Sequence, residues 1–158
     1  MVRLALYQPD IPQNTGAIIR LAACMGVALD VIGPTGFVWE EKRMRRAGMD
    51  YRELAAVSRH ASWQAFREAR AGSRLLLLTT QGAEPYHTFA YCRGDVLLLG
   101  RESAGVPLDV HQIADARLRI PMMPEARSLN VALSAAIVLG EALRQTQSFP
   151  TIPPNLDS

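Results

Sequence analysis

Three short segments of this chain combine polar side chains with glycines at points where an apolar stretch runs into a loop. They are residues 14–20 (NTGAIIR), 97–107 (LLLGRESAGVP) and 120–130 (IPMMPEARSLN). Loops that follow apolar strands are where α/β proteins build ligand sites. We therefore treat the three segments as candidate parts of a binding or catalytic site.

The first segment places Arg20 on a predicted helix that is otherwise rich in Ile, Leu and Ala, with Asn14 near its start. Asn14 can simply cap the helix while Arg20 is solvated. Alternatively, Arg20 points at a phosphate or a developing oxyanion, with the helix N–H groups nearby. The residues alone leave both interpretations open.

The second segment is a buried strand that runs into Gly100, followed by Glu102 and Gly105. It is either an ordinary turn between a strand and a helix, or a loop whose glycines let a ligand approach the backbone closely. In the second case Glu102 would orient a positive group or accept a hydrogen bond.

The third segment leads into the strongest predicted helix, residues 128–145. Ser128 is the expected N-cap of that helix, which would explain this residue without any function. Asn130 would then lie in the first turn, where its helix propensity does not favour it. The pattern fits a structural and a functional role equally.

A basic stretch is predicted to form a helix over residues 39–47, with Lys42, Arg45 and Arg46 on one face. Such a face is either solvated or contacts RNA phosphates. The formal net charge is only +2, which permits a local basic patch on a nearly neutral body.

Several classes of protein are disfavoured by what the sequence lacks. No dinucleotide-binding G-x-G-x-x-G, Walker motif or nucleophile elbow is present, and the histidines have no metal-ligand spacing, so no metal is expected. The two cysteines, Cys24 and Cys92, are far apart, which favours a reducing cytoplasm. The first residues resemble a strand rather than a signal peptide, and the longest apolar run is too short for a bilayer. We expect a cytoplasmic protein without a membrane association.

Apolar runs alternate with helical patterns along the chain. Strands are predicted at 2–7, 29–32, 75–80, 95–99 and 118–120, and helices at 14–25, 39–47, 62–70 and 128–145. This alternation predicts an α/β fold with a parallel sheet covered by helices on both faces. We expect one domain, residues 1–148, and a Pro-rich C-terminal tail, residues 149–158. General topology rules favour an unknotted sheet.

The order of the three segments resembles the SPOUT superfamily of RNA methyltransferases over almost the whole chain. Within it, the chain is most similar to the bacterial subgroup that 2'-O-methylates the wobble nucleotide of leucine tRNAs. The supporting stretches are residues 6–16, 34–37, 42–46, 48–51 and 78–80. The resemblance implies a C-terminal deep trefoil knot, which replaces the unknotted expectation, and a homodimer whose active site is completed across the interface.

The resemblance also implies a cofactor, a substrate and roles for individual residues. S-adenosylmethionine would be held in the knot, mainly by backbone groups, at Leu78, Gly100, Ile120 and Ser128. The catalytic residues would be Arg20, Asn14, Glu102, Ser128 and Asn130, with Arg20 closest to the ribose hydroxyl.

The expected activity is 2'-O-methylation of a wobble cytidine or uridine of leucine tRNAs, with tRNA bound by Lys42, Arg45 and Arg46. The alternatives are a SPOUT enzyme for another tRNA position or for rRNA, and a non-catalytic RNA-binding module.

Overall fold

The described residues of the computed structural model, 1–46, 56–82 and 84–152, form a seven-stranded sheet with the order β3-β2-β1-β6-β4-β7-β5. Every pairing of neighbouring strands is parallel, which confirms the predicted parallel sheet. The strands are β1 (Arg3–Tyr7), β2 (Ala28–Ile32), β3 (Val57–His60), β4 (Leu75–Leu78), β5 (Glu84–Pro85), β6 (Val96–Leu99) and β7 (Ala116–Arg119).

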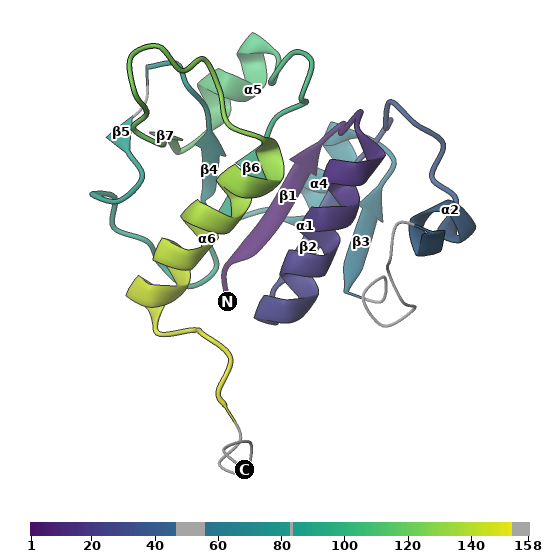
Figure 1. Ribbon diagram of the computed structural model, residues 1–158, viewed down its shortest axis with the longest axis horizontal. Coiled ribbons are helices and arrows are strands. Elements are labelled where there is room, and N and C mark those ends of the chain that lie inside the picture. Colours follow the sequence, from purple (N-terminus) through teal and green to yellow (C-terminus); the bar gives the residue numbers. More distant parts are fainter. Residues whose placement is uncertain (47–55, 83, 153–158) are drawn as a thin grey trace.

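Helices cover both faces of the sheet, as predicted (Figure 1). They are α1 (Pro12–Met25), α2 (Glu41–Arg46), α4 (Trp63–Ala69), α5 (Leu108–Ile113) and α6 (Val131–Thr146). Helices α1 and α6 lie side by side on one face, and α4 and α5 cover the other (Figure 1).

Two apolar clusters, one on each face, bury most residues of the central strands. In β4, Leu76 packs into the cluster under α1 and α6, whereas Leu75 and Leu77 pack into the cluster under α4 and α5. Because successive side chains of a strand point to opposite faces, a strand covered on both sides needs a continuous apolar run. This requirement explains the leucine runs of β4 and β6.

The starts of the two long helices differ from the sequence prediction. Helix α1 begins at Pro12 rather than at a cap formed by Asn14, and its N-cap residue Ile11 makes no side-chain cap hydrogen bond. Proline is well suited to a first helical position because its fixed φ matches the helix and its missing N–H would be unpaired there anyway.

The predicted N-cap at Ser128 is also wrong, because α6 begins at Val131 and its N-cap is Asn130. The Asn130 side chain accepts hydrogen bonds from the backbone N–H groups of Ala132 and Leu133. Asn130 is therefore not a misplaced residue inside the first turn. Its preference for a cap position explains why it is found there.

Other elements were predicted with different bounds or missed. Helix α2 falls within the predicted range 39–47, and Ser62 caps α4 through its hydroxyl, which accepts from the N–H of Ala65. Strands β3 and β5 and helix α5 were not predicted, and they contain between two and six residues each. Residues 48–51, which also supported the resemblance, lie outside the described residues.

The C-terminal segment continues beyond α6 in Figure 1. Residues 149–152 are exposed and belong to no helix or strand, and the rest of the predicted tail lies outside the described residues. Among the helices that the structure describes, none is both long and apolar enough to cross a membrane.

Candidate active site

A pocket of about 590 Å³ opens beyond the carboxyl ends of β4, β6 and β7. Leu77, Leu99 and Leu118, from the ends of these three strands, contribute apolar lining, and the loops that follow add polar groups. The chain order along the sheet changes direction here, because β6 lies between β1 and β4. Such a position is where parallel α/β sheets bind ligands.

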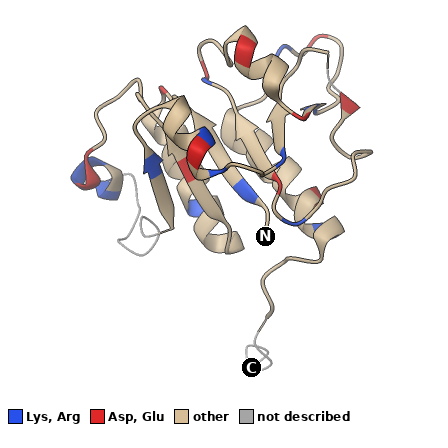
Figure 2. Cartoon of the chain, turned by 180° about the vertical axis from the view of Figure 1, so that it is seen from behind, with Lys and Arg blue, Asp and Glu red and all other residues tan. Residues whose placement is uncertain are grey.

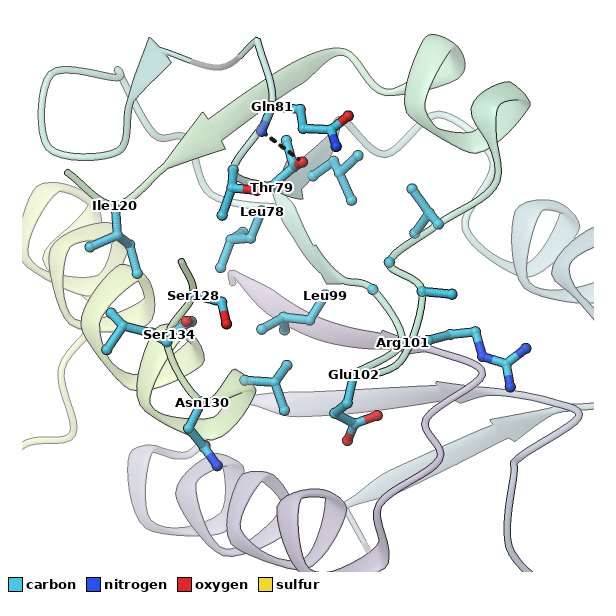
Figure 3. A pocket seen from close by; sticks show the side chains of 18 of the residues that line it. Leu78, Thr79, Gln81, Leu99, Arg101, Glu102, Ile120, Ser128, Asn130 and Ser134 are labelled. Atoms are coloured by element: carbon cyan, nitrogen blue, oxygen red, sulfur yellow. Dashed lines mark hydrogen bonds between the residues drawn. The ribbon is translucent and has the colours of Figure 1, made fainter. Parts of the chain in front are cut away.

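Side chains from distant parts of the chain meet around this pocket. Figure 3 shows Ser128, Asn130 and Glu102 on one side of it and Leu78, Thr79 and Gln81 on the other. Thr79 fixes the turn after β4, since its hydroxyl oxygen accepts a hydrogen bond from the backbone N–H of Gln81 at 3.2 Å.

The loop after β6 is held shut by two backbone hydrogen bonds between Arg101 and Gly105, with N···O distances of 2.9 and 2.8 Å. A Cβ atom on Gly100 would lie only 2.8 Å from the backbone of Gly105, so the close approach of these two backbone segments requires glycine at position 100. Gly105 has a φ of +64°, a conformation that other residues rarely adopt. The two glycines therefore fix the loop that forms one wall of the pocket.

Asn14 on α1 and Asn130 at the start of α6 are joined directly. The Asn130 side-chain N–H donates to the side-chain oxygen of Asn14 at 2.9 Å. The side-chain oxygen of Asn130 is occupied at the same time by the N–H groups of Ala132 and Leu133, at 2.8 and 3.3 Å. One residue thus caps α6 and connects the first and third sequence segments.

Glu102 is connected to Asp10, in the turn that precedes α1. The backbone N–H of Asp10 donates to Oε2 of Glu102 at 3.0 Å, and the hydroxyl of Ser103 donates to the Asp10 carboxylate. Burial, together with the neighbouring Asp10 side chain, raises the pKa of the Glu102 carboxyl above its ordinary value, although the hydrogen bond from the Asp10 backbone N–H acts in the opposite direction. The hydrogen bonds from Glu102 and Ser103 lower the pKa of Asp10. Of the two carboxyl groups, Glu102 therefore holds a proton more readily than Asp10 does.

The structure brings most of the predicted site residues to this one pocket. Those that line it are Asn14, Leu78, Gly100, Glu102, Ile120, Ser128 and Asn130. Arg20 is not among the lining residues. It lies exposed on α1, six positions beyond Asn14, which corresponds to about 9 Å along the helix axis.

The predicted RNA-binding residues Lys42, Arg45 and Arg46 lie on α2, away from the pocket lining. All three are exposed, while Met44 between them is buried in the core. Figure 2 shows the basic residues of α2 at the edge of the molecule. The three basic residues thus form the exposed side of α2, and Met44 anchors the helix to the core.

Sequence reasoning missed some residues that line the pocket or contact its lining residues. Asp10 and Ser103, which are connected to Glu102 beside the pocket, were not selected, although Ser103 directly follows Glu102 in sequence. His111 also lines the pocket from α5, a helix that was not predicted. Within the described ranges, no group of three or more His, Cys, Asp or Glu residues is arranged to hold a metal ion.

Comparison with solved structures identifies the same fold elsewhere. A structure from work on the 2-OH methylation of C/U34 on tRNA matches with a TM-score of 0.83 and 39% identity, over 92% of this chain and 90% of that chain. An AdoMet-bound rRNA methyltransferase from Sinorhizobium meliloti matches with a TM-score of 0.79 and 32% identity, over 90% of this chain and 56% of that one.

The sequence comparisons agree with the structural ones. A tRNA (cytidine(34)-2'-O)-methyltransferase of Beijerinckia indica subsp. indica is 57% identical over 151 residues, covering 94% of both chains. Residues 1–140 match the SpoU rRNA methylase family. The chain belongs to this family of methyltransferases.

Proposed function

We propose that this protein is an S-adenosylmethionine-dependent 2'-O-methyltransferase that acts on the wobble nucleotide, cytidine or uridine, of tRNA, with leucine tRNAs as its substrates. The observation that carries the proposal is the convergence of Asn14, Glu102, Ser128 and Asn130 on one pocket at the carboxyl edge of the sheet. The high identity to a relative named as a wobble cytidine methyltransferase supports the choice of substrate.

The pocket has properties that suit S-adenosylmethionine. Its volume of about 590 Å³ lies within the range of small-molecule and cofactor sites. Leucine side chains offer an apolar surface for an adenine ring, and the chain turns at Leu78, Gly100, Ile120 and Ser128 offer backbone groups for its nitrogen atoms. The AdoMet-bound relative supports the same cofactor. We assign these four positions to cofactor binding.

The cofactor supplies a methyl group on a positively charged sulfur, already activated for transfer. Transfer would form a bond from the ribose O2' to the methyl carbon as the carbon–sulfur bond breaks, and the hydroxyl proton would pass to a phosphate or to water. The protein must therefore align the reactants and favour loss of that proton.

Arg20 is assigned to the ribose hydroxyl. An arginine does not release its proton at neutral pH, so Arg20 acts as a cation rather than as a base. It binds the adjacent phosphate through hydrogen bonds and stabilises the negative charge that develops on O2'. Asn14, Glu102, Ser128 and Asn130 hold the geometry of the pocket around the reacting atoms.

The position of Arg20 supports a homodimer whose active site is completed across the interface. Arg20 is exposed on α1 and outside the pocket lining of its own chain. Next to α1, helix α6 exposes Leu133 and Ile137, which are 57% and 39% accessible and four residues apart on one helix face. A second copy that packs on α1 and α6 would cover these apolar side chains and bring Arg20 to the other pocket.

Mixed dimers test this arrangement. Arg20→Ala removes the cation, and Gly100→Val blocks the pocket by forcing atoms into the backbone of Gly105. If Arg20 acts across the interface, mixing the two inactive variants restores activity, to roughly a quarter of the wild-type sites for random pairing. If Arg20 serves its own pocket, the mixture stays inactive.

The exposed residues Lys42, Arg45 and Arg46 on α2 are assigned to tRNA phosphates. Neutralising them should weaken tRNA binding and flatten its salt dependence, while leaving cofactor affinity unchanged.

We also assign to this chain the deep trefoil knot that the resemblance implies. The insertion of β6 between β1 and β4, and the return of the chain after β7 to pack α6 over β6, support it. The single domain 1–148, the tail 149–158 and the cytoplasmic location stay predictions.

The direct test is incubation of the purified protein with labelled S-adenosylmethionine and unmodified total tRNA, followed by nucleoside mass spectrometry. We expect a 2'-O-methylated pyrimidine at the wobble position of leucine tRNAs. Methylation at another position would keep the chemistry and overturn the substrate, and absence of cofactor binding would favour a non-catalytic RNA-binding module.

A further inference from the structure

We infer that Arg59, on β3, is a phosphate-contacting residue that extends the tRNA-binding surface from α2 onto the edge of the sheet. The inference rests on the proposed function, because it assigns a further contact to the same RNA. Neither α2 nor the pocket includes Arg59, and its exposed side chain has no role in the core.

The Arg59 side chain is held in a defined position by an aromatic ring. Its guanidinium carbon lies 4.7 Å from the centre of the Trp39 ring, in a cation–π contact. The Trp39 ring is in turn stacked with Phe37, with centroids 6.3 Å apart and planes inclined by 24°. Phe37 and Trp39 both pack against the main apolar cluster, so the stack is anchored in the core.

This contact leaves the guanidinium available to a ligand. Stacking uses the flat face of the group, whereas its N–H donors lie around the edge and match the geometry of a phosphate. Among the described residues no Asp or Glu forms an ion pair with Arg59, in contrast to Arg43, which pairs with Glu40 at 3.2 Å. The charge of Arg59 is therefore not compensated by a carboxylate of the described chain.

Arg59 lies on the same face of the sheet as α1 and α2. Strand residues alternate between faces, and His60 bonds to Asp30 on the α4 side, which places Arg59 on the opposite side. Met44 of α2 and Val57 of β3 pack against the same cluster as α1. Figure 2 shows basic residues on α2 and on the neighbouring strand β3.

The ordering of Arg59 in advance has an energetic consequence. A long, flexible side chain loses rotamer freedom when it binds a ligand, at a cost of up to about 2 kcal/mol for arginine. The Trp39 ring has already restricted Arg59 in the free protein, so less of this freedom remains to be lost on binding. A negatively charged RNA backbone is the partner that matches an exposed, preorganised guanidinium beside a basic helix.

The chain contains a matched control for this arrangement. Arg67 on α4 lies over the ring of Trp63 at 5.8 Å, but Trp63 packs against the cluster on the opposite face of the sheet. Arg59→Ala and Arg67→Ala thus remove the same charge from the same kind of contact on opposite faces. Arg59→Lys keeps the charge and removes the planar donor group.

The experiment measures the dissociation constant of leucine tRNA for the full-length variants over a series of salt concentrations. Arg59→Ala should weaken binding several-fold and reduce the slope of log K against log salt by about 0.7–0.9, the value for one phosphate contact. Arg59→Lys should keep most of the slope but bind more weakly than wild type. Arg67→Ala should match wild type, and all variants should keep wild-type cofactor affinity.

An Arg59→Ala slope equal to that of wild type, or the same decrease in Arg67→Ala, would overturn the inference. If the wild-type protein methylates tRNA and Arg59→Ala binds tRNA as tightly as wild type, only the role of Arg59 is refuted. If the wild-type protein neither binds nor methylates tRNA, the proposed function is refuted as well.

Discussion

The side chain of Asn130 donates a hydrogen bond to the side chain of Asn14 across 2.9 Å, although the two residues are 116 positions apart in sequence. This contact joins the start of α6 to the first turn of α1, at the rim of the pocket. The same Asn130 side chain caps α6, so the position of the pocket rim and the start of the helix depend on one residue.

The two asparagines should differ in their effect on stability. Asn130→Ala removes the α6 cap and should lower the free energy of unfolding by about 0.5–2 kcal/mol, whereas Asn14→Ala leaves the cap in place and should have a smaller effect. Both should reduce methyl transfer, and the double variant should lose less than the sum of the two effects, because they break one contact. Urea denaturation and initial rates test this, and additive losses in activity would contradict it.

The pair formed by Asp10 and Glu102 should control the acid side of the pH–rate profile. Burial and the neighbouring Asp10 side chain raise the pKa of Glu102, so its negative form appears only as pH rises through that raised value. Asp10→Asn replaces a carboxylate with an amide that can donate to Glu102, which favours the charged form and lowers its pKa. The acid limb of kcat/KM should therefore move to lower pH.

The control for this shift is Glu84→Gln, which removes an exposed carboxylate on β5 outside the pocket lining. Its acid limb should coincide with that of wild type. An Asp10→Asn profile that coincides with wild type would mean that Asp10 does not act on Glu102.

Gly100→Ala should weaken cofactor binding by about tenfold or more. The added Cβ would lie 2.8 Å from the backbone of Gly105, and backbone atoms cannot move aside as a flexible side chain can. The loop that forms one wall of the pocket must shift, at a cost of about 1–3 kcal/mol for such overpacking. Isothermal titration calorimetry with S-adenosylmethionine measures the loss of affinity. An unchanged affinity would mean that Gly100 does not belong to the cofactor site.

Asp30 should be a stability residue without a role in methyl transfer. Its buried carboxylate accepts hydrogen bonds from Arg3 and Arg70 and contacts His60 at 2.8 Å. Burial alone would raise the pKa of Asp30, but the hydrogen bonds from Arg70, Arg3 and His60 outweigh it and lower the pKa. Asp30→Asn should lower the free energy of unfolding by about 1.5–3 kcal/mol, because it removes the carboxylate that accepts the charged hydrogen bonds of the partly exposed Arg3 and Arg70 side chains.

The sign of the pH dependence follows from the lowered pKa of Asp30. The stabilisation is fully present above the pKa of an unfolded Asp, about 3.9, and is lost as pH falls through the lower value of the folded state. Stability curves of wild type and Asp30→Asn should therefore converge in acid. The exposed Glu68→Gln on α4 is the control, and parallel curves for Asp30→Asn would contradict the assignment.

Much of the fold could be predicted because its strands and longest helices carry strong local patterns. The leucine runs of β4 and β6 identified strands that are buried on both faces, and the apolar pattern of α6 identified the longest helix. Short elements such as α5, with six residues, contain too few residues for a periodic pattern to appear.

The site was only partly predictable, for a related reason. The glycines and the polar residues of the three segments stand out in sequence, whereas Asp10 acquires its role through Glu102, which is 92 positions away. The cap at Asn130 was missed because Ser128 is an equally good cap residue by type. Only the hydrogen bonds to Ala132 and Leu133 distinguish the two.

The proposed function requires that the methyl group is transferred to the 2'-hydroxyl of the wobble nucleotide. The test uses two leucine tRNAs assembled by ligation, which are identical except at the wobble position. One carries ribose at that position and the other carries 2'-deoxyribose. The wobble position is nucleotide 34, as in the name of the relative from Beijerinckia indica. We predict methyl transfer to the first and none to the second, with similar binding of both. Equal transfer to the two tRNAs would mean that the 2'-hydroxyl of the wobble nucleotide is not the methyl acceptor.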